Sequence, residues 1–193
     1  MKTKNILIAF AVTALVQLFI PLKMIYDSYI TETEGVEYHF KARPIDPNDP
    51  FRGKFITLDF ELEAVATNDT TWQEGDTAYI ILAKDENGFA EGKAVSREKP
   101  DGAVDYLTAK AKRLLDNSLL FVSLPFDRYY MEESKAPAAE SAYFKYAANQ
   151  DYKPVYAVVA VRKGNSVLKD LIINGMPIRE YVIKNRDKNK NHQ

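Results

Sequence analysis

The sequence predicts a single N-terminal transmembrane helix followed by a mainly antiparallel all-β domain with one short helix. Three observations support this fold class: an uncharged apolar segment near the first residue, alternating apolar and polar residues over much of the remaining chain, and turn residues between the alternating segments. The 193 residues suffice for one domain of ordinary size and an appendage. We expect an anchor over residues 1–30, a sandwich or partly open barrel over residues 31–183, and a disordered basic tail over residues 184–193.

The anchor is predicted by eighteen residues without a charge, Asn5 to Leu22, which lie between Lys4 and Lys23. A helix that is apolar on every face must be buried or lie in lipid. At 1.5 Å per residue the segment is roughly 27 Å long, close to the ~30 Å thickness of the hydrocarbon core of a bilayer. A cleaved signal peptide is the alternative, but the residues that follow the apolar run offer only Ser28 as a small residue for the cleavage site.

The basic residues around the anchor predict its orientation. Lys2, Lys4 and the α-amino group outnumber Lys23 on the far side, so the positive-inside rule places residues 27–193 outside the cytoplasm. We therefore expect a single-pass protein of the cytoplasmic (inner) membrane with an extracytoplasmic C-terminal domain. The absence of cysteine suits an oxidising compartment.

Two alternating segments begin the β domain. Residues 36–43 predict a half-buried strand, and residues 44–51 form a connector in which three prolines fix φ and remove backbone donors. Residues 53–64 alternate apolar with acidic side chains and predict one antiparallel strand with a single face on the core. The apolar positions of that strand are Ile56, Leu58, Phe60 and Leu62.

The rest of the domain contains two predicted hairpins. Residues 77–96 predict a hairpin around Asn87 and Gly88, because an Asn-Gly turn accepts two positive φ angles. Residues 104–115 fit both a helix and a strand, and we favour the strand. The remaining predicted elements are a buried strand over 119–124, a short helix over 136–148, a hairpin over 155–173 and a short strand over 176–178.

The composition excludes several chemistries. Without cysteine there is no disulfide, thiolate metal site, cysteine nucleophile or lipid-modified N-terminal cysteine. The two histidines, His39 on the polar side of a strand and His192 near the last residue, predict no metal cluster, and only His39 could serve a Ser-His-Asp triad. We expect no metal, no cofactor and no catalytic residue.

The charge distribution argues against nucleic-acid binding. The net charge is -1, and residues 31–183 contain 19 basic and 25 acidic residues. No basic stripe is present to neutralise a phosphate backbone. The domain is therefore acidic, whereas both ends of the chain are basic.

A motif between Asp46 and Phe60 carries a family resemblance. Its defining positions are Asp46, Pro47, Asp49, Pro50, Arg52, Gly53, Phe55, Leu58 and Phe60. Together with the anchor and residues 125–133, this motif resembles the GDYXXLXY family of bacterial membrane-anchored proteins. The resemblance covers almost the whole chain and implies a periplasmic domain that accompanies a larger polytopic membrane protein, with no reaction attached.

The chain departs from the family motif at informative positions. Lys54 replaces the acidic residue of the family name, so no carboxylate is required there as an acid, base or ligand. Phe55 and Phe60 replace tyrosines, which leaves ring packing as the contribution of those positions. The Arg52 guanidinium can bind one of the preceding aspartates bidentately. We interpret the motif as a structural corner between the proline-rich connector and a central strand.

These observations favour a non-enzymatic binding or accessory module that partners a polytopic membrane protein. Aromatic rings and arginines are common in contact surfaces. The candidate binding residues are Arg52, Phe126, Arg128, Tyr129 and Tyr130. Ordinary core packing is the alternative for the aromatic rings.

Two other functions remain open. The first is an anchored β-domain serine hydrolase of signal-peptidase-like layout, with a nucleophile among Ser28, Ser96 and Ser123. The second is a cation site at Asp46, Asn48 and Asp49, although these residues lack the spacing of a calcium-binding loop and turn capping is favoured. An acid/base pair among Asp59, Glu61 and Glu63 is also conceivable, but a solvated strand face is favoured.

Overall fold

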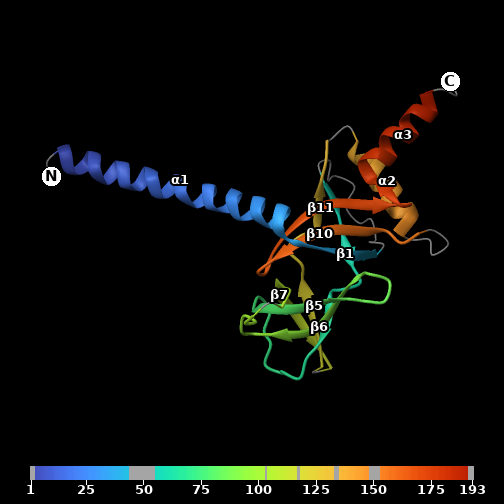
Figure 1. Ribbon diagram of the computed structural model, residues 1–193, viewed down its shortest axis with the longest axis horizontal. Coiled ribbons are helices and arrows are strands. Elements are labelled where there is room, and N and C mark those ends of the chain that lie inside the picture. Colours follow the sequence, from blue (N-terminus) through green and yellow to red (C-terminus); the bar gives the residue numbers. More distant parts are fainter. Residues whose placement is uncertain are drawn as a thin grey trace.

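The protein consists of a long N-terminal helix that projects from a β domain containing two five-stranded sheets (Figure 1). The computed structural model describes residues 3–43, 55–102, 104–116, 118–132, 135–147 and 153–190, with side chains as far as Lys184. The arrangement confirms the predicted fold class, because the antiparallel strands follow a single long apolar helix and one of the sheets is nearly closed.

Helix α1 (Thr3–Glu34) is long and apolar enough to cross a membrane. No residue of its most apolar window is buried, and the Phe10 side chain is 72% exposed. The 32 residues are roughly 48 Å long, so about a dozen continue past Leu22, the last residue of the uncharged segment. These last turns pack on β10 and β11, where Thr31 is only 1% exposed.

The first sheet has the strand order β12-β11-β10-β1-β3 and is antiparallel throughout. Its strands are β1 (Val36–Arg43), β3 (Asp59–Phe60), β10 (Tyr156–Arg162), β11 (Asn165–Ile173) and β12 (Met176–Pro177). A two-residue turn at Lys163 and Gly164 joins β10 to β11, with φ angles of 50° and 86°. Two positive φ angles match the twist of a hairpin, and the predicted hairpin over residues 155–173 is confirmed.

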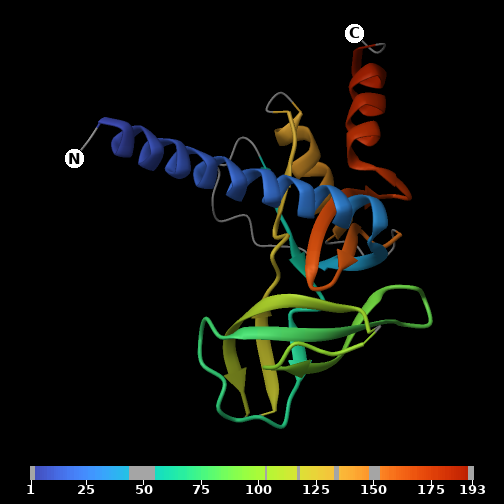
Figure 2. The same cartoon turned by 60° about the vertical axis from the view of Figure 1, so that its left-hand side comes forward.

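The second sheet has the order β4-β8-β7-β5-β6 and curls until its edge strands β4 and β6 contact each other (Figure 2). Its strands are β4 (Ala64–Ala66), β5 (Thr77–Lys84), β6 (Ala90–Ser96), β7 (Tyr106–Leu115) and β8 (Leu119–Ser123). The preference for a strand over residues 104–115 is therefore confirmed by β7. A short ribbon of β2 (Phe55–Thr57) and β9 (Arg128–Tyr130) completes the β structure.

The prediction of one continuous strand over residues 53–64 is wrong. The described part of this segment divides into β2, β3 and β4, which pair with β9, β1 and β8 respectively. The alternation was nevertheless informative, because Ile56, Leu58, Phe60 and Leu62 are all buried. Every second residue stays buried although the segment changes its pairing partner twice. The alternation in the sequence does not indicate these changes of partner.

The turn predicted at Asn87 and Gly88 has a different geometry from the one expected. Only Gly88 has a positive φ, 83°, and the Asp85 carboxylate accepts hydrogen bonds from the amides of Asn87 and Phe89. The Asp85 side chain thus organises a longer loop, as aspartate often does in turns. An Asn-Gly turn with two positive φ angles occurs instead at Asn174 and Gly175.

Two helices lie at the end of the first sheet away from the barrel (Figures 1 and 2). Helix α2 (Ala136–Ala147) confirms the predicted short helix. Helix α3 (Ile178–Lys190) extends through most of the tail for which we predicted disorder from Lys184. Ile178 and Val182 are buried and anchor its first turns, after which each added residue gains one backbone hydrogen bond.

One hydrophobic core connects both sheets and α2. At its centre the Phe126 ring lies 4.8 Å from the Phe40 ring and 5.3 Å from the Phe60 ring. The sheets are also joined by backbone, since the amide of Thr108 on β7 donates to the carbonyl of Gly164 at 3.0 Å. The β10–β11 turn is therefore fixed on the barrel.

Candidate functional site

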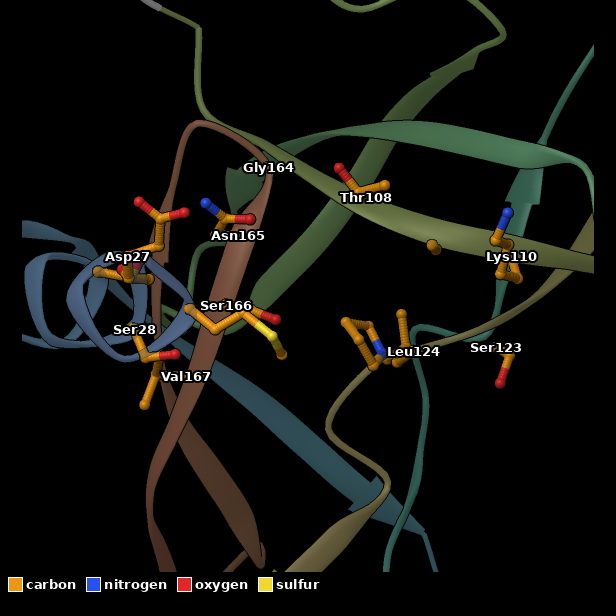
Figure 3. A pocket seen from close by; sticks show the side chains of 14 residues that line it. Asp27, Ser28, Thr108, Lys110, Ser123, Leu124, Gly164, Asn165, Ser166 and Val167 are labelled. Carbon is orange, nitrogen blue, oxygen red and sulfur yellow. Dashed lines mark hydrogen bonds between the residues drawn. The ribbon is translucent and has the colours of Figure 1, made fainter. Parts of the chain in front are cut away.

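A cavity of about 530 Å³ lies where the anchor meets the β domain. Its walls come from the last turns of α1, the start of β11 with the preceding turn, strand β7 and the end of β8. Figure 3 shows α1 nearly end-on, with the cavity beside the helix and between Ser166 and Leu124. The volume is within the range of small-molecule sites.

The α1 wall is held in place by the junction between the helix and β1. The Thr31 hydroxyl donates to the Asp27 carbonyl at 2.7 Å, and Asp27 also forms an ion pair with Lys23. A Cβ on Gly35 would lie only 2.3 Å from the Thr31 carbonyl oxygen and 3.2 Å from Ala160 Cβ. Only glycine allows α1 to end this close to β10, so a side chain at residue 35 would force the helix end away from the sheet.

The opposite wall depends on Gly164. With φ at 86°, this residue occupies a conformation that favours glycine. An added Cβ would also lie 2.5 Å from Thr108 Oγ1 and 2.5 Å from Tyr106 Cε2. The β10–β11 turn can therefore approach β7 only because residue 164 has no side chain.

Two polar side chains of the cavity lining differ in their hydrogen-bond partners. The hydroxyl oxygen of Ser166 is buried and has no hydrogen-bond partner within the structure as described. The Lys110 ammonium donates to the Gly75 carbonyl at 3.2 Å and to Thr77 Oγ1 at 3.0 Å. No described carboxylate lies within ion-pair distance of Lys110, so its charge is not neutralised by this part of the chain.

Two of the three candidate serine nucleophiles, Ser28 and Ser123, line this cavity, whereas Ser96 lies on β6 outside it. Ser123 is directly opposite Lys110 in the register of β7 and β8. The Lys110 ammonium is engaged by Gly75 and Thr77 and points away from the Ser123 hydroxyl (Figure 3). The arrangement thus brings a serine and a lysine together without the contact that general-base activation needs.

The candidate binding residues do not gather at the cavity. Phe126 is 5% exposed in the aromatic core, and Tyr129 is 3% exposed with its hydroxyl donating to Asp170 Oδ1 at 2.9 Å. Burial and the Asp170 carboxylate raise the pKa of Tyr129 to about 12. For these two rings the structure matches the alternative of core packing.

Arg128 and Tyr130 are exposed on β9, where both contact the Phe55 ring of β2. The Arg128 guanidinium carbon lies 5.0 Å from the centre of that ring, and the Tyr130 ring lies 5.5 Å from it. Leu58 and Phe60 of the motif are buried. Several predicted residues lie outside the ranges that the structure describes. They are Arg52 and the other positions of the motif and of the candidate cation site, namely Asp46, Pro47, Asn48, Asp49, Pro50 and Gly53.

A pair of carboxyl groups forms a second polar cluster, beside a smaller cavity of about 220 Å³. Arg43 Nη2 lies 3.3 Å from Asp59 and 3.5 Å from Glu63, and Lys112 Nζ lies 3.6 Å from Glu63. Burial and the hydrogen bond with Asp59 raise the pKa of Glu63 from 4.5 to about 7. Glu61, in contrast, forms an ion pair with Lys41 at 2.8 Å.

The sequence placed Asp59, Glu61 and Glu63 on one solvated face, but a turn after β3 separates them. That turn brings Glu63 back over Asp59, a contact for which the sequence pattern contained no signal. The pair resembles an ionic network more than a reactive site, because two cations hold it. Within the described ranges no group of three histidine or acidic side chains is arranged to hold a metal ion.

The comparisons with known proteins identify a family. The family model described as GDYXXLXY protein matches residues 17–171. This range begins within α1 and ends in β11, so it includes the second sheet, the first sheet except β12 and the end of β11, and the cavity. Neither the search of curated proteins nor the search of solved structures gives a match. Because the match covers most of the chain, the protein belongs to the GDYXXLXY protein family.

Proposed function

We propose that this protein is a membrane-anchored, non-enzymatic extracytoplasmic binding module that accompanies a polytopic membrane protein of the bacterial inner membrane. The observation that carries the proposal is the cavity at the foot of the anchor, whose walls come from both the anchor and the β domain. A ligand in this cavity contacts α1 directly. Binding in the domain can therefore be transmitted to the membrane-spanning helix.

The surface of α1 supports a partner within the membrane. Its apolar side chains are exposed on every face, for example Leu15 and Phe19, while contacts to the domain begin only in the last turns. In a bilayer such a helix packs against lipid or against other transmembrane helices. A polytopic protein supplies those helices.

Crosslinking tests the proposed partner. A photo-reactive residue at Leu15 on α1 is expected to form one discrete adduct with a polytopic membrane protein, identified by mass spectrometry. The matched control carries the same residue at Glu86, in the exposed β5–β6 turn, and should not form that adduct. A second control keeps the photo-reactive residue at position 15 and replaces the other residues of the segment 5–22 by leucine. If this variant gives the same adducts as the natural helix, the proposal of a specific partner is rejected.

The serine hydrolase remains the second candidate, because Ser28, Ser123 and Lys110 line one cavity. A fluorophosphonate probe tests it on the full chain. Our proposal predicts no labelling. Labelling that disappears in Ser28→Ala or Ser123→Ala would establish the hydrolase instead.

A further inference from the structure

We propose that the cavity at the foot of the anchor binds an extended peptide segment, which adds a strand between the edges of β11 and β7. This inference deepens the proposed function and rests on it for the source of the segment, an extracytoplasmic loop of the polytopic partner. It assigns to the cavity a ligand that is recognised through its backbone.

The cavity runs along the edges of two strands. Successive side chains of a strand point to opposite faces of its sheet, so three consecutive residues line one cavity only where that cavity borders the strand edge. Residues 165–167 of β11 and residues 108–110 of β7 line the cavity in this way. The opposite edges of the two strands are occupied by β10 and β5. The cavity therefore lies between the edges that β11 and β7 turn towards each other.

The backbone of β11 directs hydrogen-bonding groups into this gap. The pair that closes a two-residue hairpin turn is hydrogen-bonded, and such pairs alternate along an antiparallel ladder with pairs that are not. Gly164, Ser166 and Leu168 therefore direct their N–H and C=O groups away from β10. The Gly164 carbonyl agrees with this pattern, because it accepts a hydrogen bond from the Thr108 amide of β7 at 3.0 Å.

Neighbouring strands leave this edge of β11 open. β7 and β11 form a single parallel bridge, between Leu107 and Gly164. β12 pairs only with Ile172 and Ile173 at the other end of β11. Between these points no strand within the described ranges pairs with the outer edge of β11. The outward N–H and C=O of Ser166 are therefore free for an added strand.

β7 offers a second edge, because β8 ends beside it. Ser123, the last residue of β8, is opposite Lys110, and the chain then reaches Pro125, which has no amide hydrogen to donate. The Thr108 carbonyl lies on this edge together with the amide that donates to Gly164. Because β7 and β11 are parallel at their bridge, a segment antiparallel to one strand is antiparallel to both.

The size of the cavity fits a short piece of strand. A strand rises about 3.3 Å per residue, lies about 4.8 Å from its neighbour and packs about 10 Å from the next layer, so one residue takes roughly 160 Å³. The cavity of about 530 Å³ thus has room for about three residues. The Ser166 hydroxyl, buried and without a partner in the described structure, provides a further hydrogen bond to such a segment.

The lining favours an uncharged segment. Its only charged residues are Asp27 and Lys110, one of each sign. Asp27 is paired with Lys23, and the Lys110 ammonium is held by two oxygen atoms outside the cavity (Figure 3). Met24 and Leu124 add apolar surface. No charge therefore remains in the lining to select an ion, whereas a neutral peptide finds both apolar contacts and backbone partners.

The position of the cavity along α1 points to a loop of a membrane protein. Met24 in the cavity wall is two residues past Leu22, the end of the uncharged segment, and lies roughly 3 Å beyond it along the helix axis. Segments that join transmembrane helices leave the hydrocarbon core at this level. A loop of a protein whose helices pack on α1 can therefore reach the cavity.

Selection from a phage-displayed library of random peptides, on the full chain in detergent, tests the proposal. Peptides enriched on the wild type are expected to be uncharged. Ser166→Pro removes the outward N–H, at a position where an edge strand accepts proline. Ser166→Ala is the matched control, because both variants lack the hydroxyl and only the proline variant lacks the amide. Ser166→Pro should bind the selected peptides roughly tenfold more weakly than Ser166→Ala, the effect of one hydrogen bond.

A second pair of variants leaves both sheets unchanged. Ser28→Trp places a large ring in the cavity from the α1 side and should abolish binding of the selected peptides. Tyr29→Trp, at the exposed neighbouring residue outside the cavity lining, should bind like the wild type. Hydrogen exchange identifies the binding mode, because bound peptide should slow exchange of the Ser166 and Leu168 amides.

Three results would overturn the added strand. They are enrichment of the same peptides on Ser28→Trp and the wild type, equal affinity of Ser166→Pro and Ser166→Ala, and exchange of the Ser166 amide that bound peptide leaves unchanged. The crosslink at Leu15 lies within the membrane and does not use the cavity. Peptide binding without a Leu15 adduct would reject the polytopic partner alone, and an adduct without peptide binding would reject the added strand alone.

Discussion

Glu63 is a carboxyl group whose environment favours the protonated form. Its burial and its hydrogen bond with Asp59 make ionisation of the Glu63 carboxyl unfavourable. The positive charges of Arg43 and Lys112 offset only part of this effect. A group whose pKa is higher in the folded than in the unfolded protein stabilises the fold when it is protonated. Its contribution is complete below the unfolded pKa and is lost as the pH rises through the folded pKa.

We therefore expect the free energy of unfolding to fall between pH 4.5 and about pH 7, by on the order of 2 kcal/mol from this group. Glu63→Gln keeps an amide that can donate to Asp59 and should remove most of this pH dependence. Denaturant unfolding at several pH values measures it. Glu61→Gln, on the exposed neighbour paired with Lys41, should leave the pH dependence unchanged. If both variants behave like the wild type, Glu63 does not titrate as described.

Among the elements, the β10–β11 hairpin has two structural roles. Its turn forms one wall of the cavity and also joins the two sheets through the hydrogen bond from Thr108 to Gly164. Two separate features favour glycine at position 164: its positive φ angle and its close approach to β7. A substitution there therefore strains the backbone and displaces a packed neighbour at once.

Gly164→Ala is expected to lower the free energy of unfolding by roughly 2–4 kcal/mol, from backbone strain and from overpacking against Thr108 and Tyr106. Gly88→Ala is the matched control, because Gly88 has a similar φ of 83° and an added Cβ would contact nothing within 4 Å. It should lose only about 1 kcal/mol. Thermal and denaturant unfolding compare the two variants. An equal loss in both would show that the contact with β7 contributes nothing.

At the scale of the whole molecule, the end of α1 packs directly on the β domain. The helix continues for about a dozen residues past the uncharged segment and packs on β10 and β11 before Gly35 ends it. This junction fixes how far the cavity lies from the membrane. The side of the membrane on which the domain lies is predicted by the lysines that flank the anchor.

Single cysteines test this orientation cleanly, because the wild-type chain has none. Glu86→Cys, in the exposed β5–β6 turn, should react with a membrane-impermeant maleimide applied to the periplasmic side of intact cells. Lys4→Cys should react only after the inner membrane is opened. The cysteine-free protein provides the background. If Lys4→Cys reacts in intact cells and Glu86→Cys reacts only after the inner membrane is opened, the domain lies in the cytoplasm and the predicted orientation is rejected.

Local patterns in the sequence were sufficient for the anchor, most strands and α2. An uncharged apolar run, alternation with a period of two, and an alanine-rich segment each depend on neighbouring residues, so they survive in the folded chain. The exceptions arise from contacts between distant segments. Residues 53–64 kept their alternation while pairing with three strands, and α3 continued into a polar tail because buried Ile178 and Val182 support its first turns.

The sequence by itself determined that this protein has a membrane-length helix and an antiparallel β domain without cysteine chemistry. Only the tertiary structure decided where its polar groups meet. Lys110, Ser166 and Met24 belong to three elements far apart in the chain, and they line one cavity because Gly35 and Gly164 allow close backbone approach. Such contacts arise from packing between distant segments, and no periodicity in the sequence records them.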